Sequence, residues 1–494
     1  MPSDASSQPA TYTREALLSL AGRLALDRVD RIPAETETLL LVTDEMRALG
    51  SGAALADWIT DAGGNDPRED AFRELFLAFL EFAATRTAAL EAGVTSLRRE
   101  LLLRIANQTQ GAPRYLEASA AVAVHCFYHE YVFAETAAET RAVELLLARS
   151  AQEPPSPTDI AIIGAYRPLR ALAHARRLPG IFIGEDSQRL QRLLRLDILD
   201  WIQETKLASG LECLTPVGDA VSLAVRAQYE ENPYPRWSYM SVDQPRDSNV
   251  GQGLKILIAG CGTGQHALNV AAAYPAADIL ALDLSLASLA YAARAAIAYG
   301  FRGLRFAQAD ILALDRVPGA FDIIVCEGVL HHLRDPEAGL AALLSRLKPG
   351  GKLKIAVYSN SGRRWFAPVA ALRDRLNLAP TLDGIRALRA ALFDLPDGDP
   401  AKFVTTRMDF YFTSMCRDLM FHVQEHRFDL PELARLFERH GLTVEELTVP
   451  AKARDIFHGY HPDADPARDL ERWGAVEARH DYLFGSMYHV WLRA

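Results

Sequence analysis

The segment LKILIAGCGTG, residues 254–264, most strongly constrains the fold, because an apolar run leads directly into three glycines at alternate positions. Gly260, Gly262 and Gly264 permit a tight backbone turn and let a ligand approach the main chain closely. A helix predicted from Gln265 onward directs its free amide groups at that ligand. The pattern therefore predicts a strand, loop and helix that together bind a nucleoside cofactor.

Further segments of the same kind extend this unit into a sheet. The apolar run ADILALDLS, residues 277–285, places Asp283 about 20 residues after the last glycine, where a carboxylate accepts hydrogen bonds from ribose hydroxyls. Strands are also expected at 304–310, from Phe321 onward and at 352–359, and helical segments separate them. This alternation is typical of a parallel, doubly wound α/β sheet.

Taken in order, these motifs resemble the class I S-adenosylmethionine (SAM)-dependent methyltransferases. The resemblance rests on GCGTG, on Asp283, on QAD ending at Asp310, on EGVLHHL after the fourth strand and on LKPGG before the fifth. It covers residues 254–359 and implies a Rossmann-like, seven-stranded, mainly parallel sheet that binds SAM and releases S-adenosylhomocysteine. The cofactor contacts that it implies are Gly260, Cys261, Gly262, Gly264, Gln265, Asp283, Leu284, Asp310, Ile311 and Glu327.

The chain departs from this family in two places. Ile258 stands near the end of the first strand, where the family usually carries an acidic residue, so the amino group of SAM must be anchored differently. The fourth strand ends in CEGV, residues 326–329, and lacks the (D/N)PPY sequence associated with methylation of exocyclic base amines and of some glutamines. The second departure argues against a base N-methylase.

The chain divides into three regions. They are an α-helical domain of unknown role (1–205), a linker with an aromatic strap over the cofactor site (206–250) and a SAM-dependent methyltransferase domain (251–494). The α-helical domain is predicted because apolar residues recur there at spacings of three and four residues. A helical cap insertion at about 361–429 interrupts the third, because the common fold passes quickly from its fifth strand to its last helix. The segments 442–449 and 487–494 are expected to close the sheet as an antiparallel pair.

Two segments are expected to bind the methyl acceptor. Prolines hold residues 228–237, QYEENPYPRW, extended, either as a lid over a planar ligand or as a linker on the sheet edge. Residues 421–426, FHVQEH, bring His422 and His426 to one face whether extended or helical. Instead of binding the acceptor, the two histidines could belong to a structural hydrogen-bond network. Arg427 could likewise form an ion pair with Glu425 or Asp429. The predicted acceptor-binding residues are Tyr229, Asn232, Tyr234, Arg236, Trp237, Tyr411, His422, Gln424, His426 and Arg427.

Glu327, His331 and His332 follow the fourth strand, near the expected position of the transferred methyl group. Glu327 is a candidate to orient the methionyl part or the acceptor, and either histidine to take a proton from the acceptor. The alternative for the histidines is that they cap or pack the next helix. No metal is predicted, because His422 and His426 lack an evident third ligand nearby.

Net charge, cysteine spacing and hydropathy restrict what the protein binds and where it is located. The net charge of −10 argues against a broad nucleic-acid surface, because such surfaces neutralise phosphates. The five cysteines are scattered without metal-ligand spacing, as in proteins of a reducing compartment. No apolar run reaches the roughly 18 residues of a membrane span, and the first residues lack a signal core, so a cytoplasmic protein without membrane attachment is expected.

The sequence thus favours a SAM-dependent methyltransferase that acts on an oxygen or nitrogen atom of a small molecule, or of a peptide or protein. A non-catalytic adaptor is one alternative, in which the helical domain binds a protein partner or a second copy of the chain. An RNA methyltransferase is another. An NAD-dependent oxidoreductase fits less well, because GxGxG occurs here with LKPGG and VLHHL.

Overall fold

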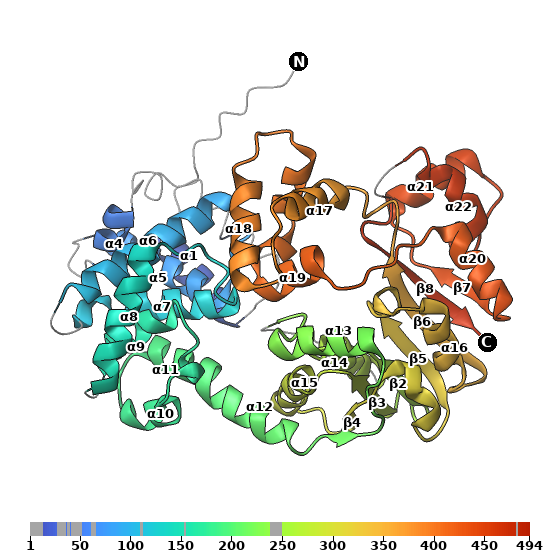
Figure 1. Ribbon diagram of the computed structural model, residues 1–494, viewed down its shortest axis with the longest axis horizontal. Helices are drawn as coiled ribbons and strands as arrows, with labels where there is room; N and C mark the ends of the chain where they lie inside the picture. Colours follow the sequence, from blue (N-terminus) through green and yellow to red (C-terminus); the bar gives the residue numbers. More distant parts are fainter. Residues whose placement is uncertain are drawn as a thin grey trace. The chain divides into compact units, whose positions relative to one another are not determined.

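The computed structural model describes residues 13–26, 36, 40, 52–60, 66–108, 112–152, 155–237, 249–480 and 483–494. The chain forms two compact units, and each draws on two stretches of sequence (Figure 1). The helical unit comprises Met1–Ile202 and Leu378–Cys416, and the sheet unit comprises Gln203–Asn377 and Arg417–Ala494. Residues 238–248 of the predicted linker lie outside the described residues.

The N-terminal region is helical, as its periodicity predicts. Its core consists of apolar side chains such as Phe76, Phe79 and Leu101, which are inaccessible to solvent. No helix in the described part of the chain combines the length and apolar character needed to cross a bilayer. The helices of this region are α1 (Arg14–Leu26), α4 (Gly52–Thr60), α5 (Pro67–Phe82), α6 (Ala88–Ala106), α7 (Leu116–Tyr128), α8 (Ala137–Gln152), α9 (Pro157–Gly164), α10 (Leu178–Ile181), α11 (Gln188–Leu194) and α12 (Asp200–Ala208).

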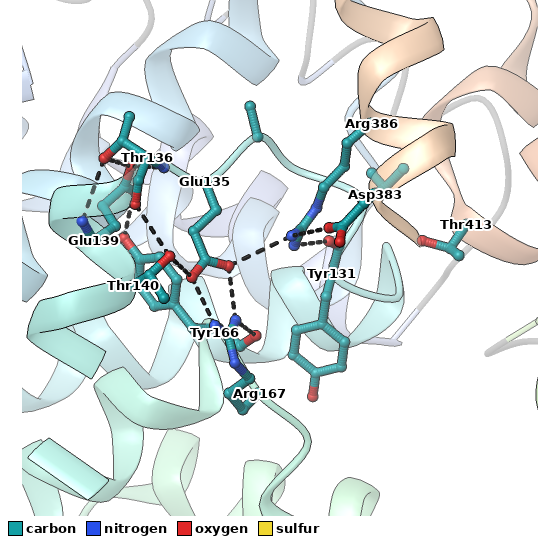
Figure 2. A network of polar contacts seen from close by, with 12 residues as sticks. Tyr131, Glu135, Thr136, Glu139, Thr140, Tyr166, Arg167, Asp383, Arg386 and Thr413 are labelled. Carbon is teal, nitrogen blue, oxygen red and sulfur yellow. Dashed lines mark hydrogen bonds and ion pairs between the residues drawn. The ribbon is translucent and has the colours of Figure 1, made fainter. Parts of the chain in front are cut away.

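Part of the predicted cap insertion belongs to the helical unit. Its helix α18 (Leu382–Phe393) is bound there by charged contacts, which Figure 2 shows. Arg386 donates to the carbonyl oxygen of Tyr131 at 2.6 Å and lies 3.4 Å from a carboxylate oxygen of Glu135. Arg167 donates to both oxygens of the same carboxylate at 2.7 Å. One polar network therefore connects the two stretches of sequence that make up the helical unit.

The sheet unit contains one eight-stranded sheet with the order β1-β4-β3-β2-β5-β6-β8-β7. All neighbouring strands run parallel except the pairs β6–β8 and β7–β8. This confirms the predicted Rossmann-like sheet with a closing antiparallel pair. The strands are β1 (Glu212–Cys213), β2 (Lys255–Ala259), β3 (Asp278–Asp283), β4 (Leu304–Gln308), β5 (Phe321–Glu327), β6 (Leu347–Tyr358), β7 (Thr443–Leu447) and β8 (Met487–Arg493).

Helices cover both faces of this sheet, because its central strands are apolar on both sides. In β2, Ile256 and Ile258 face one core, and Leu257 and Ala259 face the other. The first core includes α14 and α15, and the second includes α16, α20, α21 and α22. The helices of this unit are α13 (Ala220–Glu231), α14 (Gln265–Ala273), α15 (Leu286–Ala298), α16 (Pro336–Leu344), α17 (Phe366–Arg375), α20 (Leu430–Arg439), α21 (Ala451–Tyr460) and α22 (Leu470–Glu477), and α19 (Thr413–Phe421) continues into it from the helical unit.

The edge strand β1 is an addition to the seven strands expected from sequence. Glu212 and Cys213 pair in parallel with Ala307 and Gln308 of β4. Both β1 residues are exposed, so they carry no apolar alternation from which a strand is predicted.

Glu477 in α22 titrates at an unusual pH because it is buried against β8. Tyr488 donates its hydroxyl to Oε2 of Glu477 at 2.7 Å, and burial raises the pKa of Glu477 to about 7. Between about pH 4.5 and pH 7 the folded state retains a proton that the unfolded chain has released. The free energy of unfolding therefore falls as pH rises through this window.

We expect Glu477→Gln to remove this dependence. The variant should match the unmodified protein near pH 5 and gain up to about 2 kcal/mol of unfolding free energy at pH 8, because it carries no charge to bury. Urea unfolding at both pH values measures the difference. Glu446→Gln on β7, an exposed position, is the matched control and should change neither value. Equal stabilisation at both pH values would contradict the assignment.

Candidate functional site

The loop after β2 requires glycine at all three alternate positions. Gly260, Gly262 and Gly264 have φ values of +78°, +52° and +86°, in the left-handed region that side-chain-bearing residues rarely adopt. A Cβ atom at Gly260 would lie 2.2 Å from a methyl carbon of Val329, and one at Gly262 would lie 2.5 Å from the carbonyl oxygen of Tyr234. The loop therefore presents bare peptide groups at the start of α14, as a site for a nucleoside cofactor requires.

Asp283 ends β3 with its carboxylate turned to this loop. Oδ2 accepts a hydrogen bond from the amide of Gly262 at 2.8 Å, and Oδ1 accepts one from the amide of Ser285 at 2.9 Å. Burial raises the pKa of Asp283, while these amide hydrogen bonds oppose the rise. The remaining lone pairs of the two oxygens are the acceptors that a ribose diol needs.

The next strand supplies the neighbouring part of the site. Asp310, which follows β4, is 3% exposed, and its Oδ1 accepts a hydrogen bond from the amide of Leu312 at 2.9 Å. Ile311 is buried beside it. Gln308 at the end of β4 donates to the carbonyl oxygen of Leu284 at 2.8 Å, which holds the loop after Asp283 against β4. Asp310, Ile311 and Leu284 thus lie along the carboxyl edge where the predicted adenine contacts belong.

The aromatic strap, residues 228–237, contacts the glycine loop directly. The prediction that this whole segment is extended is wrong for residues 228–231, which form the last turn of α13. The amide of Thr263 donates to the carbonyl oxygen of Tyr234 at 3.3 Å, and the hydroxyl of Thr263 donates to that of Pro235. The indole of Trp237 donates to the carbonyl oxygen of Thr263 at 3.1 Å. Nearer the helix end, the hydroxyl of Ser285 donates to the carbonyl oxygen of Tyr229 at 3.2 Å. The strap is therefore hydrogen-bonded to Thr263 of the glycine loop and to the side chain of Ser285 in the loop after Asp283.

Glu327 at the end of β5 lies among three basic side chains. Its carboxylate is 3.1 Å from Nδ1 of His266, 2.9 Å from Nζ of Lys354 and 3.5 Å from Nδ1 of His489. Burial opposes ionisation of Glu327, but these partners outweigh it and lower its pKa to about 2. A carboxylate of this kind stays ionised at neutral pH, so it can orient a cationic group and is a poor proton acceptor.

A second polar cluster joins α13, α19 and the segment after it. The hydroxyl of Tyr229 donates to Oδ1 of Asp418 at 2.7 Å and lies 3.3 Å from Nε2 of His422. The ring of His422 stacks on that of His332, with centroids 3.5 Å apart. Tyr229 and Tyr234 also stack, at 6.1 Å, which connects this cluster to the strap. The predicted acceptor residues Tyr229 and His422 and the predicted catalytic residue His332 thus come together.

The backbone of Gln424 orients both stacked histidines. Nδ1 of His332 donates to the carbonyl oxygen of Gln424 at 2.8 Å, and Nδ1 of His422 accepts from its amide at 3.2 Å. Gln424 and His426 contact each other through their side chains at 3.1 Å. Residues 422–427 belong to no helix or strand, so the helical conformation considered for this segment is not the one adopted. Burial lowers the pKa of His332 well below its usual value, so this ring is neutral at pH 7.

His331 differs from its neighbour. Its ring is fully buried and stacks on Tyr358 at 3.9 Å, and neither of its nitrogens has a hydrogen-bond partner among the described residues. Its carbonyl oxygen accepts from the amide of His426 at 2.7 Å. Burial, and secondarily the neighbouring His332, lower the pKa of His331 well below its usual value.

The other predicted acceptor residues lie in varied surroundings. Arg427 donates to Glu425 at 2.8 Å, which is the ion pair considered as its alternative role. Tyr411 belongs to the helical unit, where its hydroxyl donates to the carbonyl oxygen of Thr405 at 2.9 Å. Asn232 and Arg236 are half-buried on the strap.

Sequence reasoning missed Asp418. It paired His422 with His426, whereas the structure brings His422 together with Asp418, Tyr229 and His332. The signal was present, because Asp418 and His422 are four residues apart at the end of a helix and such residues share a face. The basic partners of Glu327 come from three separate elements and had no local signal.

Comparison with known proteins agrees with this geometry. Residues 256–351 match the model of a methyltransferase domain. An uncharacterized protein of Synechococcus sp. is 34% identical over 253 residues, which cover 46% of this chain and 60% of that protein. A ubiquinone biosynthesis O-methyltransferase of Idiomarina loihiensis is 33% identical over 129 residues, covering 26% of this chain and 52% of that enzyme. The chain thus spans between half and two thirds of the length of these relatives.

Among solved structures, PKMT2 of Rickettsia typhi in complex with AdoHcy aligns with 56% of this chain and 52% of its own, at 18% identity and a TM-score of 0.37. The family assignment rests instead on the matched domain and on the order of the glycine loop, Asp283 and Asp310 along the sheet. Residues 256–351 therefore form a methyltransferase domain, and over this part the chain is similar to SAM-dependent methyltransferases of class I.

Proposed function

We propose that the protein transfers the methyl group of SAM to an oxygen or nitrogen atom of an acceptor, which is a small molecule or a peptide or protein side chain. The observation that carries the proposal is the glycine loop, whose three left-handed residues leave peptide groups bare beside a carboxylate at the end of β3. An intact arrangement of this kind also argues against the alternative of a non-catalytic adaptor.

The residues fit SAM in three places. Asp283 offers carboxylate oxygens to the ribose, and Leu284, Asp310 and Ile311 lie where the adenine belongs. Glu327 fits the amino group of the methionyl part, because it is ionised and lies at the end of β5. This assignment gives the cationic amino group a carboxylate although Ile258 replaces the usual acid of the first strand.

SAM supplies an activated methyl group, so the chain's own task is to place the acceptor in line with it and to exclude water. The strap and the cluster of Tyr229, His332 and His422 are suited to this. His332 is buried, Tyr229 and His422 are half-buried, and Tyr234 connects the cluster to the cofactor loop. One relative is named as an O-methyltransferase, which favours an oxygen acceptor without identifying it.

The test begins with calorimetric titration of SAM and of S-adenosylhomocysteine into the purified protein, followed by transfer of radiolabelled methyl groups into a cell extract. We expect both ligands to bind and one labelled product class to appear. Ribonuclease treatment separates an RNA product from a protein or small-molecule product. Binding without labelled product across extracts would favour the adaptor, and absence of binding would refute the methyltransferase.

Tyr229→Phe should separate acceptor binding from cofactor binding. It removes the hydroxyl that donates to Asp418 but keeps the ring, so we expect turnover to fall about tenfold with little change in SAM affinity. His426→Ala is expected to act in the same direction. Tyr460→Phe, at an exposed position on α21, is the matched control and should leave both quantities unchanged. Equal losses of turnover and SAM affinity would indicate a purely structural role for Tyr229.

A further inference from the structure

Asp418 is a buried carboxylate without a cationic hydrogen-bond partner. It is 3% exposed, and its hydrogen-bond partners in the described part of the chain are two phenol groups: Tyr229 at 2.7 Å and Tyr358 at 3.5 Å. The neighbouring guanidinium of Arg363 is itself paired with Glu425. Buried carboxylates are ordinarily paired with a cation or coordinated to a metal ion. The surroundings of Asp418 are therefore incomplete for a charged group.

Two imidazoles lie beside this carboxylate. A ring nitrogen of His332, a ring nitrogen of His422 and a carboxylate oxygen of Asp418 all lie within 4.8 Å of one another. Because Nδ1 of His332 donates to the carbonyl oxygen of Gln424, its Nε2 carries a free lone pair. A histidine that ligates a metal usually donates its other nitrogen to a backbone carbonyl in this way.

His422 is held more loosely. Nδ1 is 3.2 Å from the amide nitrogen of Gln424, and Nε2 is 3.3 Å from the hydroxyl of Tyr229. Both distances are long for hydrogen bonds. Coordination through Nδ1 gives up only the contact with Gln424, whereas coordination through Nε2 gives up both contacts, because the ring proton must then move to Nδ1.

We propose that Asp418, His332 and His422 bind a divalent transition-metal ion of the Zn²⁺ or Fe²⁺ type. Two imidazole nitrogens and one carboxylate oxygen suit these ions, whereas Mg²⁺ and Ca²⁺ prefer oxygen ligands throughout. Ligands of one tetrahedral ion lie about 3.3 Å apart, so binding draws the three donor atoms together by about 1.5 Å or less. It also tilts the two stacked imidazole rings, because their in-plane lone pairs must converge on the ion. The three residues come from the turn after β5 and from the end of α19, so the ion would join these elements.

Three protein ligands leave a coordination position open, as in catalytic rather than structural metal sites. This consequence rests on the proposed function, because it assumes that the acceptor occupies the cluster beside the strap. An acceptor oxygen bound to the ion would have a lowered pKa and would release its proton to solvent more readily. The inference therefore favours a hydroxyl acceptor that can reach the ion.

The test measures ion binding alone, without SAM or acceptor. We expect untagged protein, stripped with chelator, to bind about one equivalent of Zn²⁺ by calorimetry, and to give visible absorption when loaded with Co²⁺. Asp418→Asn and His422→Ala should each weaken Zn²⁺ binding about 100-fold or more. Asp455→Asn and His458→Ala, exposed positions on α21, are matched controls for adventitious surface binding and should leave it unchanged.

Two further measurements keep the result interpretable. Circular dichroism and SAM affinity of each variant report whether the sheet unit still folds, and we expect SAM to bind both site variants. Zn²⁺ binding that is absent in the unmodified protein, or equal in all four variants, would overturn the metal site. Failure of SAM to bind a protein that still binds Zn²⁺ would refute the methyltransferase proposal and leave the metal site standing.

Discussion

Replacement of Asp283 by alanine should raise the dissociation constant for SAM about 100-fold, or about 2.7 kcal/mol. The change removes the carboxylate that ends β3 and leaves the amides of Gly262 and Ser285 without their acceptor. Hydrogen bonds to charged groups contribute about 1.5 to 3 kcal/mol each. The glycine loop also loses the hydrogen bond between the amide of Gly262 and Asp283, which holds it in place before SAM binds. Calorimetric titration of SAM into both proteins measures the difference.

A control on the same strand separates this effect from general damage. Asp278 lies at the opposite end of β3, half exposed, and pairs with Arg305 on the surface. Asp278→Asn should leave SAM affinity unchanged, because the pair is solvated and distant from the loop. Urea unfolding should show that Asp283→Ala remains folded. Unchanged affinity in folded Asp283→Ala would mean that the ribose is held elsewhere, and the assignment of the glycine loop as the cofactor site would fail.

The sheet was predictable because its signals are local. The glycines of the loop, the apolar run from Ile256 to Ala259 and the position of Asp283 are each set within a few residues of sequence. A run that is apolar on both faces also predicts a central strand covered by helices on both sides. The family resemblance then supplied the cofactor.

The acceptor cluster was less predictable because its members are distant in sequence. Tyr229 comes from α13, His332 from the turn after β5 and Asp418 from the end of α19. No periodicity connects them, and only the Asp418 to His422 spacing was visible locally. The division of the insertion between the two units was not predictable either. Residues 378–416 pack with the N-terminal helices, and the composition of a helix does not specify which core it joins.

A large loss of stability is expected when the contacts between α18 and the rest of the helical unit are removed. Arg389 on α18 is 2% exposed, and its hydrogen bonds with described residues lie in the helical unit. It donates to Glu91 at 2.5 Å, to the carbonyl oxygen of Phe410 at 2.8 Å and to that of Val132 at 3.1 Å. Arg389→Ala should destabilise the unit by about 3 to 5 kcal/mol, because Glu91 is then left buried without a cation.

Calorimetry should show this as a fall of about 10 °C in the unfolding temperature of the helical unit. Arg141→Ala, at an exposed position on α8, is the matched control and should change it little. The double variant Arg389→Met with Glu91→Leu should recover much of the loss, since an apolar pair removes the unpaired charge. If Arg389→Ala melted like the control, α18 would not be an integral part of this core, and the insertion would instead be an appendage of the sheet unit.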